Sequence, residues 1–207
     1  MNYDLWKMIG AFNSALLPLR EAHAQANTAI IDLVELRSQL RSQLEELRSV
    51  ITERYSERDA YFVIFPLTAH CDEIVKMLIL DTLHLEWPPL QQELYQVADA
   101  GDLFYELLDN ALGKPETLPL VYEVYYFCLQ DGFCGRYSVS PNRVIEYLQK
   151  LQKHIHIQPI TTASLTPIAT KRSYFRIPNY SYYCGAGLLL ASMYYFLTFL
   201  ASTWQPV

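Results

Sequence analysis

Residues 60–83 read AYFVIFPLTAHCDEIVKMLILDTL and are apolar at most positions around a helix. A helix without a polar face is typical of the centre of a bundle, where other helices cover it on every side. Pro66 lies in this stretch and should kink or begin the helix, because proline lacks the N–H group that a helix interior needs. The sequence therefore predicts a central helix from Asp59 to about Leu85.

Amphipathic segments precede this central helix. Apolar residues at helical spacing near the N-terminus predict a short helix that ends near Pro18. The run from about Glu21 to Arg54 predicts one long helix with a single apolar stripe, made of Ile30, Leu33, Leu36, Leu40, Leu44, Leu47 and Ile51. We favour a bundle within one chain over a coiled coil between chains, because coiled coils usually sustain strict heptads over a longer run.

Shorter helices are expected after the central one. Trp87-Pro88-Pro89 should end the central helix, since the residue before a proline avoids the helical conformation. The later helices are predicted over 90–97, over 102–112 with Gly101 as a hinge and Asp102 as N-cap, over 116–130 with Gly132 after its end, and over 141–154 with Ser140 as N-cap. No alternation of strands and helices is visible, so the predicted fold class is all-α, with a helical domain over residues 1–155.

Charge limits the classes of partner. The chain has 207 residues, with 16 Lys and Arg against 22 Asp and Glu, and a formal net charge of −6. No basic excess is available to neutralise a phosphate backbone, so nucleic acid is not an expected partner.

Cysteine and histidine spacing does not indicate a metal site. The four cysteines lack CxxC spacing and are interpreted as reduced packing residues: Cys71, Cys128, Cys134 and Cys184. Zinc-like spacing is missing from His70–Cys71 with Cys128 and Cys134, and also from the pair His154 and His156. We therefore expect no metal and no cofactor.

The C-terminal part of the chain has the pattern of a membrane span. Residues 177–207 contain no Asp, Glu, Lys or Arg, and Tyr182–Ala201 is long enough to cross a hydrocarbon core of about 30 Å at about 1.5 Å per residue. Lys171, Arg172 and Arg176 precede the span, which by the positive-inside rule puts the N-terminal domain in the cytoplasm. A buried core helix is the alternative interpretation.

This pattern divides the rest of the chain. We expect a linker over 156–181, a transmembrane helix over 182–203 and a short periplasmic tail over 204–207, in contact with inner-membrane lipid. Small residues near one-turn spacing permit close approach of another helix in the membrane, and therefore a homodimer or a partner's span, at Gly185, Gly187, Ala191 and Ser192.

Asp72 and Glu73 form the most unusual polar site in the sequence. They lie in the middle of the most apolar helix, where an unpaired buried charge costs several kcal/mol. Neighbouring residues on a helix point about 100° apart, so the two carboxylates cannot face one partner group. One interpretation is a contact site for another protein. The other is that one carboxylate is exposed and its neighbour holds Arg136 or a helix N-terminus. We further expect Arg136 to pair with Asp72 or Glu73, since arginine suits buried bidentate pairing.

The same pair allows a catalytic alternative. Asp72, Glu73 and His70 could serve a membrane-tethered enzyme if they shared a deep pocket. No nucleophile or cofactor motif accompanies them, so we expect no enzyme activity and name no catalytic residue.

Several motifs occur together in an order that resembles a known family. They are residues 68–75 (TAHCDEIV), Trp87, residues 90–95, Ala100-Gly101, Phe104-Tyr105, residues 121–129, and Gly132-Phe133-Cys134-Gly135-Arg136-Tyr137. Over residues 25–155 the chain resembles the DotU/TssL/IcmH family. The most specific pieces are Asp72-Glu73 and the element from Gly132 to Tyr137.

The resemblance implies a role in a bacterial secretion machine. Family members have a hook-like, two-lobed bundle of helices in the cytoplasm and one C-terminal span in the inner membrane. In type VI secretion they join a TssM/IcmF-type membrane protein and recruit baseplate proteins of the TssK and TssE kind. In type IVB secretion the homologue stabilises the core complex with IcmF. Positions matching Asp72 and Glu73 lie in a region associated with a cleft and with partner contact.

Overall fold

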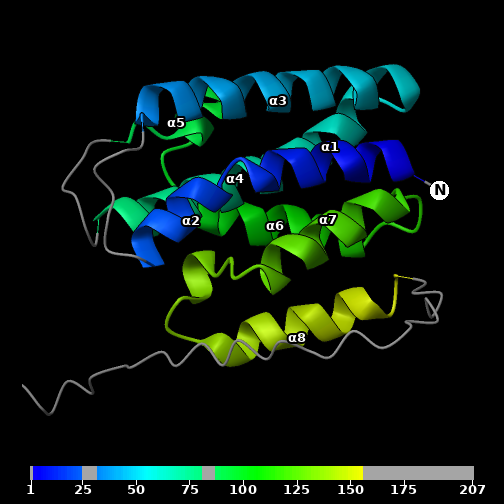
Figure 1. Ribbon diagram of the computed structural model, residues 1–207. Helices are drawn as coiled ribbons and strands as arrows, with labels where there is room; N and C mark the ends of the chain where they lie inside the picture. The colour runs from blue at the N-terminus through cyan, green and yellow to red at the C-terminus, as the bar shows by residue number, and fades with distance from the viewer. Residues whose placement is uncertain (1, 25–31, 81–86, 156–207) are drawn as a thin grey trace, which may run out of the picture. The chain divides into compact units, whose positions relative to one another are not determined.

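The computed structural model describes residues 2–24, 32–80 and 87–155, which all belong to one compact unit, Met1–Gln158 (Figure 1). The described residues form helices and no strands, which confirms the all-α class. The helices are α1 Tyr3–Ser14, α2 Leu17–Ala24, α3 Leu33–Arg54, α4 Glu57–Leu80, α5 Leu90–Tyr95, α6 Ala100–Leu112, α7 Pro119–Gln130, the 3-10 turn η1 Gly135–Tyr137 and α8 Pro141–Gln152.

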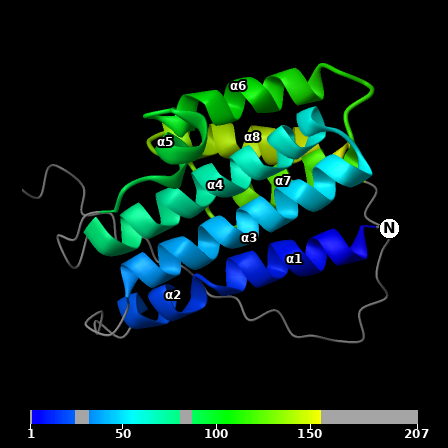
Figure 2. The ribbon, with the colours of Figure 1, turned by 90° about the horizontal axis from the view of Figure 1, so that it is seen from above.

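Helix α4 is the centre of the bundle, as its apolar sequence predicts. It contacts α2, α3, α5, α6 and α7, and Figure 2 shows it between α3 and α6. Helix α8 packs on α7 and η1, at the opposite edge of the unit from α3 in Figure 1. Pro66 lies well inside α4 and does not begin it, since the helix starts at Glu57.

The N-terminal helices differ from the prediction at two points. Pro18 lies in the first turn of α2, where the missing N–H group costs nothing, so it helps to begin a helix instead of ending one. The single helix expected over 21–54 is wrong, because Asp32 is extended and its carboxylate caps α3 at the N–H groups of Val34 and Glu35. From Leu36 onward the stripe on α3 is confirmed, with buried Leu36, Leu40, Leu44, Leu47 and Ile51. Leu33 is half-buried, and Ile30 lies outside the described residues.

Helix α6 begins earlier than expected. Its N-cap is Asp99 and not Asp102, because the Asp99 carboxylate accepts the N–H of Gly101 at 2.9 Å. Gly101 therefore lies in the first turn and is not a hinge. A Cβ atom on Gly101 would lie 3.1 Å from the Cα of Gly135, so glycine lets this turn approach the chain before η1.

The end of α7 is the expected glycine C-cap. Gly132 has a φ of 106°, its N–H bonds to the carbonyl of Leu129, and the N–H of Phe133 bonds to the carbonyl of Cys128 at 3.0 Å. These two bonds define a Schellman motif. The motif turns the chain back, so that Phe133 is only 2% exposed and its ring lies 4.1 Å from that of Phe104.

The predicted membrane segments lie outside the described residues. This applies to the linker over 156–181, the span over 182–203 with Gly185, Gly187, Ala191 and Ser192, and the tail over 204–207. Among the residues that are described, no helix combines the length and the apolar character needed to cross a bilayer. The span and the two-lobed, hook-like shape stay predictions.

Candidate functional site

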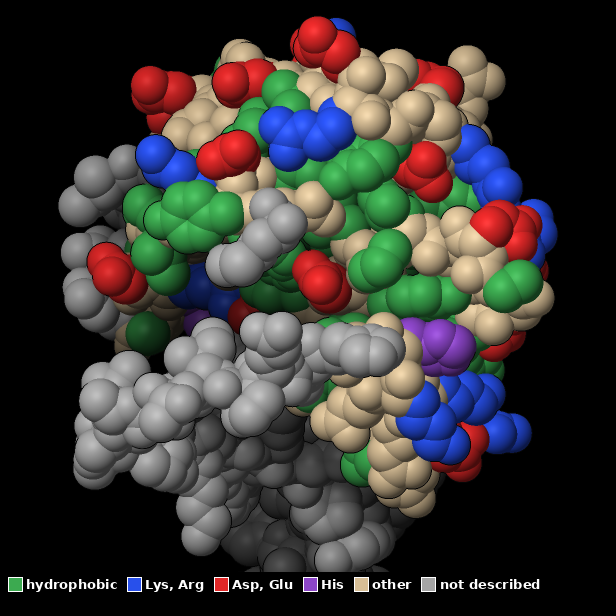
Figure 3. Space-filling model, turned by 90° about the vertical axis from the view of Figure 1, so that its right-hand side faces the viewer, with side chains coloured by type: hydrophobic (Ala, Val, Ile, Leu, Met, Phe, Trp, Pro, Cys, Tyr) green, Lys and Arg blue, Asp and Glu red, His purple; other side chains and the backbone are tan. Residues whose placement is uncertain are grey.

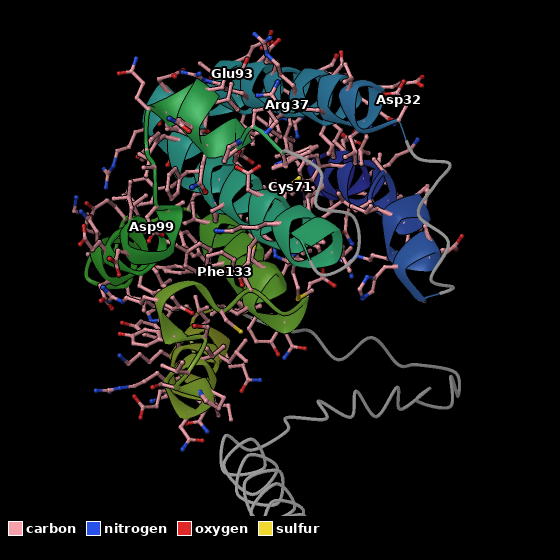
Figure 4. The ribbon with its side chains drawn as sticks, turned by 90° about the vertical axis from the view of Figure 1, so that its left-hand side faces the viewer. Asp32, Arg37, Cys71, Glu93, Asp99 and Phe133 are labelled. Carbon is pink, nitrogen blue, oxygen red and sulfur yellow. The ribbon has the colours of Figure 1, made fainter. Side chains whose placement is uncertain are left out.

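Helix α4 carries Asp72 and Glu73 directly after the buried residues His70 and Cys71 (Figure 4). The α5 segment, residues 87–95, lies against α4 on one side. The chain between α7 and α8 lies near it on another, and we call residues 132–137 the α7–η1 segment. Each of the two carboxylates bonds to one of these segments, in agreement with the expectation that they cannot share a partner.

Asp72 holds the beginning of α5. Its Oδ1 accepts the Nε1–H of Trp87 at 2.7 Å and the N–H of Leu90 at 2.9 Å, and its Oδ2 accepts the N–H of Gln91 at 2.7 Å. The first N–H groups of a helix have no partner within the helix, and Pro89 at the N-cap position provides no side-chain acceptor. Asp72, only 5% exposed, therefore caps α5 from another helix. Burial raises the pKa of Asp72, and these N–H donors oppose that rise.

Glu73 holds the α7–η1 segment. Its two oxygens accept the N–H groups of Cys134 at 2.8 Å and Gly135 at 2.9 Å. Gly135 has a φ of 49°, so two successive N–H groups can point at one carboxylate. Burial raises the pKa of Glu73, and the two N–H donors oppose this effect. The pair is thus used within the fold, with one carboxylate for each surface segment.

The expected ion pair of Arg136 with Asp72 or Glu73 is wrong. Within the described part of the chain, the nearest carboxylate to its guanidinium is that of Asp102, with Nη1 and Oδ1 3.8 Å apart. The guanidinium instead lies over the rings of Tyr105 and Tyr137, 5.3 and 5.0 Å from their centroids. The reason is that the α7–η1 segment presents its backbone to α4, which leaves the side chain of Arg136 on the outside. The glycines at 132 and 135 were the sequence signal for such a backbone contact.

Two arginines of α3 also hold α5. The Nε–H of Arg37 donates to the carbonyl of Pro88 at 2.9 Å, and its Nη2 pairs with Glu93, as Figure 4 shows. Arg41 reaches the other oxygen of Glu93 at 3.1 Å. The sequence placed both arginines on the polar side of α3 but contained no signal for their partner more than fifty residues away.

A third polar cluster joins α2, α4 and the end of α7. Asp131 pairs with both terminal nitrogens of Arg20 and lies 2.9 Å from the Nε2 of His70, which is 1% exposed. Burial alone would raise the pKa of Asp131, but the hydrogen bonds from His70 and Arg20 outweigh it and lower the pKa to about 2. Sequence reasoning missed this cluster, since its members lie on three separate helices.

His70, Asp72 and Glu73, the residues of the catalytic alternative, do not share a site. His70 bonds to Asp131, Asp72 to α5 and Glu73 to the α7–η1 segment, so the three side chains do not converge on one substrate position. Two hollows of about 570 and 350 Å³ on the described surface are lined mainly by residues of α3, α6 and α8 and include none of the three.

Of the residues considered for a metal, Cys71, Cys128 and His154 pack against other side chains, whereas Cys134 is half-buried. His156 and Cys184 lie outside the described residues. Cys71 and Cys128 are buried, and burial raises the pKa of both thiols. The ring of His154 stacks on that of Tyr122 at 4.7 Å. Within residues 2–24, 32–80 and 87–155 no three His, Cys, Asp or Glu side chains are arranged to hold a metal ion.

Fold and site together define a helical domain in which a central pair of carboxylates organises the domain's own surface. The model of the DotU family, described as Type VI secretion system protein DotU, matches residues 7–200. The chain belongs to the DotU family, as the sequence motifs indicated. Membership points to a component of a type VI or type IVB secretion system, and the family is a structural one and not a known family of enzymes.

One solved structure supports the fold. The structure of DotU from Francisella novicida matches with a TM-score of 0.65 and 24% sequence identity, and the match covers 74% of this chain and 100% of that chain. A comparison with curated proteins finds no match.

Proposed function

We propose that this chain is a non-enzymatic subunit of the membrane complex of a bacterial type VI secretion system. In this proposal the segment over 182–203 anchors it in the inner membrane, with the helical domain in the cytoplasm and the C-terminus in the periplasm. The observation that carries the proposal is the extent of the family match, which runs from the described bundle through residue 200 and so includes most of the apolar segment. An apolar, charge-free segment of this length suits a transmembrane helix.

The proposed partners are a TssM/IcmF-type membrane protein and baseplate proteins of the TssK and TssE kind. The arrangement of α5 and the α7–η1 segment supports a docking role, because both are surface segments with their backbone fixed by α4. Asp72 and Glu73 serve this docking indirectly, by holding the segments in place. Self-association through Gly185, Gly187, Ala191 and Ser192 is part of the same proposal.

Alkaline extraction of bacterial membranes tests the anchor. We expect the full chain to stay in the membrane pellet, whereas a variant that ends at Arg176 is released. A tag at the N-terminus should resist protease added to spheroplasts, because the domain faces the cytoplasm. Release of the full chain, or cleavage of the tag in intact spheroplasts, contradicts the proposal.

Co-expression with the two classes of partner distinguishes the two secretion systems. Retention of both an IcmF-type protein and a baseplate protein supports the type VI assignment. Retention of the IcmF-type protein alone supports the alternative, the IcmH/DotU subunit that stabilises a type IVB core complex. If neither is retained, the docking role is wrong.

A further inference from the structure

Arg136 lies on the outside of the domain in an unusual environment. Its guanidinium rests over two tyrosine rings, and we call Arg136, Tyr105 and Tyr137 the arginine platform. The side chain of Arg136 is 30% exposed, and the one ion pair that it makes with a described residue, Asp102, is longer than a hydrogen bond at 3.8 Å. Stacking on aromatic rings occupies the faces of a guanidinium, and the N–H groups at its edge, which here also interact with the hydroxyls of Tyr137 and Tyr147, can donate to a carboxylate.

The platform is held rigidly. Glu73 fixes the N–H groups of Cys134 and Gly135, immediately before Arg136. The hydroxyl of Tyr105 donates to the carbonyl of Cys134 at 3.0 Å, so the ring under the guanidinium is tied to the same backbone. Gly101 approaches Gly135 from α6 and leaves no room for the segment to shift inward. A side chain ordered before binding loses little conformational entropy when a partner arrives.

The charge of the chain changes sign at this point. Residues 132–155 contain a single acid, Glu146, against four basic residues, Arg136, Arg143, Lys150 and Lys153, and every other Asp and Glu of the chain precedes residue 132. Glu146 is paired with Arg143 at 2.9 Å. On the face drawn in Figure 3, acidic and basic groups are interspersed with apolar ones where side chains are described. From α6, Asp102 faces Arg136, and Asp109 accepts the hydroxyl of Tyr147 on α8. Because Arg143 and Glu146 offset each other, the positive charge open to an acidic segment of a partner is that of Arg136, Lys150 and Lys153.

We propose that Arg136 anchors a partner protein through a carboxylate on an exposed acidic segment. The incoming carboxylate takes the place of Asp102, which is 64% exposed and holds the guanidinium only loosely. Val139, 72% exposed and three residues beyond Arg136, adds apolar area beside the anchor. Tyrosine and arginine are enriched among the residues that dominate protein interfaces. This inference rests on the proposed function, because it names the chemistry by which a secretion-complex partner docks.

Binding of the IcmF-type or baseplate protein retained in the co-expression experiment tests the proposal. Arg136→Gln should weaken binding about tenfold, the change that corresponds to a lost charge-assisted hydrogen bond. Arg136→Lys should also weaken it, since lysine lacks the planar fork. Asp102→Asn should strengthen it several-fold by removing the competing carboxylate. Arg143→Gln is the matched control, an exposed arginine already paired within its own helix, and should leave binding unchanged.

These outcomes separate docking from a structural role. Loss of the arginine platform by misfolding would weaken binding in the Arg136 variants but cannot produce a gain in Asp102→Asn. A photo-reactive phenylalanine at position 139 should cross-link to a partner peptide rich in Asp and Glu. Equal binding by Arg136→Gln and Arg143→Gln, or a basic or neutral cross-linked peptide, overturns the proposal and leaves the proposed function standing. If the unmodified chain retains neither protein, both fail together.

Discussion

The α5 segment and the α7–η1 segment are anchored in the same way but packed differently. Each has its N–H groups bonded by one of two neighbouring carboxylates on α4. Around α5 the other ties are polar contacts from Arg37 and Arg41, and edge-to-face contacts of the half-buried Tyr95 ring with Tyr61 and Phe65 of α4. Leu90 is its one fully buried side chain. The α7–η1 segment instead inserts Phe133 into the core beside Phe104.

The difference shows that hydrogen bonds mainly orient a surface segment, whereas burial of a large side chain holds the segment on the core. Hydrogen bonds in a folded protein replace bonds to water, so each adds only about 0.5–1.5 kcal/mol. Burial of a large aromatic side chain adds more, because it removes apolar area from water. We therefore expect α5 to open locally while the bundle stays folded, and the α7–η1 segment to open only when the bundle unfolds.

The substitution Phe133→Ala should have the largest effect on stability and tests whether the core residue anchors the α7–η1 segment. The substitution removes a ring that is fully enclosed and should lower the free energy of unfolding by about 3–5 kcal/mol. Denaturant unfolding of the full chain in detergent measures it. Val139→Ala is the control from the same region, exposed and expected to cost at most about 0.5 kcal/mol. Similar values for both variants would show that the segment is not anchored by its core residue.

Substitution of each carboxylate by alanine tests how strongly Asp72 and Glu73 hold their respective segments. Asp72→Ala leaves the N–H groups of Leu90 and Gln91 without an acceptor and should destabilise α5 by about 3 kcal/mol, at about 1–3 kcal/mol for each such group. Amide hydrogen exchange should therefore speed up over residues 90–95 and not over residues 133–137.

Glu73→Ala is the matched control, one residue away on the same helix. Exchange should speed up at Cys134 and Gly135, by a smaller factor, because Phe133 still holds the segment. Faster exchange of both segments in either variant would mean that the two carboxylates act as one unit.

Local patterns explain why much of the fold could be predicted from the sequence. The apolar stripe of α3, the all-round apolar character of α4 and the glycine after α7 each depend on residues close together in the chain, and the structure confirms all three. One alternative from the sequence was that one carboxylate is exposed while the other holds Arg136 or a helix N-terminus. Asp72 does hold the N-terminus of α5, through the N–H groups of Leu90 and Gln91, but Glu73 is half-buried and bonded as well, so neither carboxylate is exposed.

The missed contacts are long-range. Arg37 with Glu93, and Arg20 with His70 and Asp131, depend on how helices distant in sequence are placed, which no spacing rule describes. Arg136 shows the same limit. The sequence predicted correctly that the segment around Arg136 contacts Glu73. It could not show that backbone N–H groups of this segment, and not the guanidinium, would face the carboxylate.

Acid should weaken the polar tie at the start of the α7–η1 segment. Asp131 precedes Gly132 and has a pKa lowered from 3.8 to about 2. A carboxyl group with a lowered pKa in the folded state stabilises the fold above its ordinary pKa, and this contribution disappears as pH falls toward the lowered value. The expected loss of unfolding free energy between about pH 4 and pH 2 is about 2 kcal/mol.

Denaturant unfolding across this pH range should show the loss in the unmodified chain but not in Asp131→Asn, and the two stabilities should converge near pH 2. Arg20→Gln should reduce the loss, since it removes one of the two partners that lower the pKa. A full loss in Asp131→Asn would assign the acid sensitivity to other carboxylates and leave Phe133 as the main anchor of the segment at every pH.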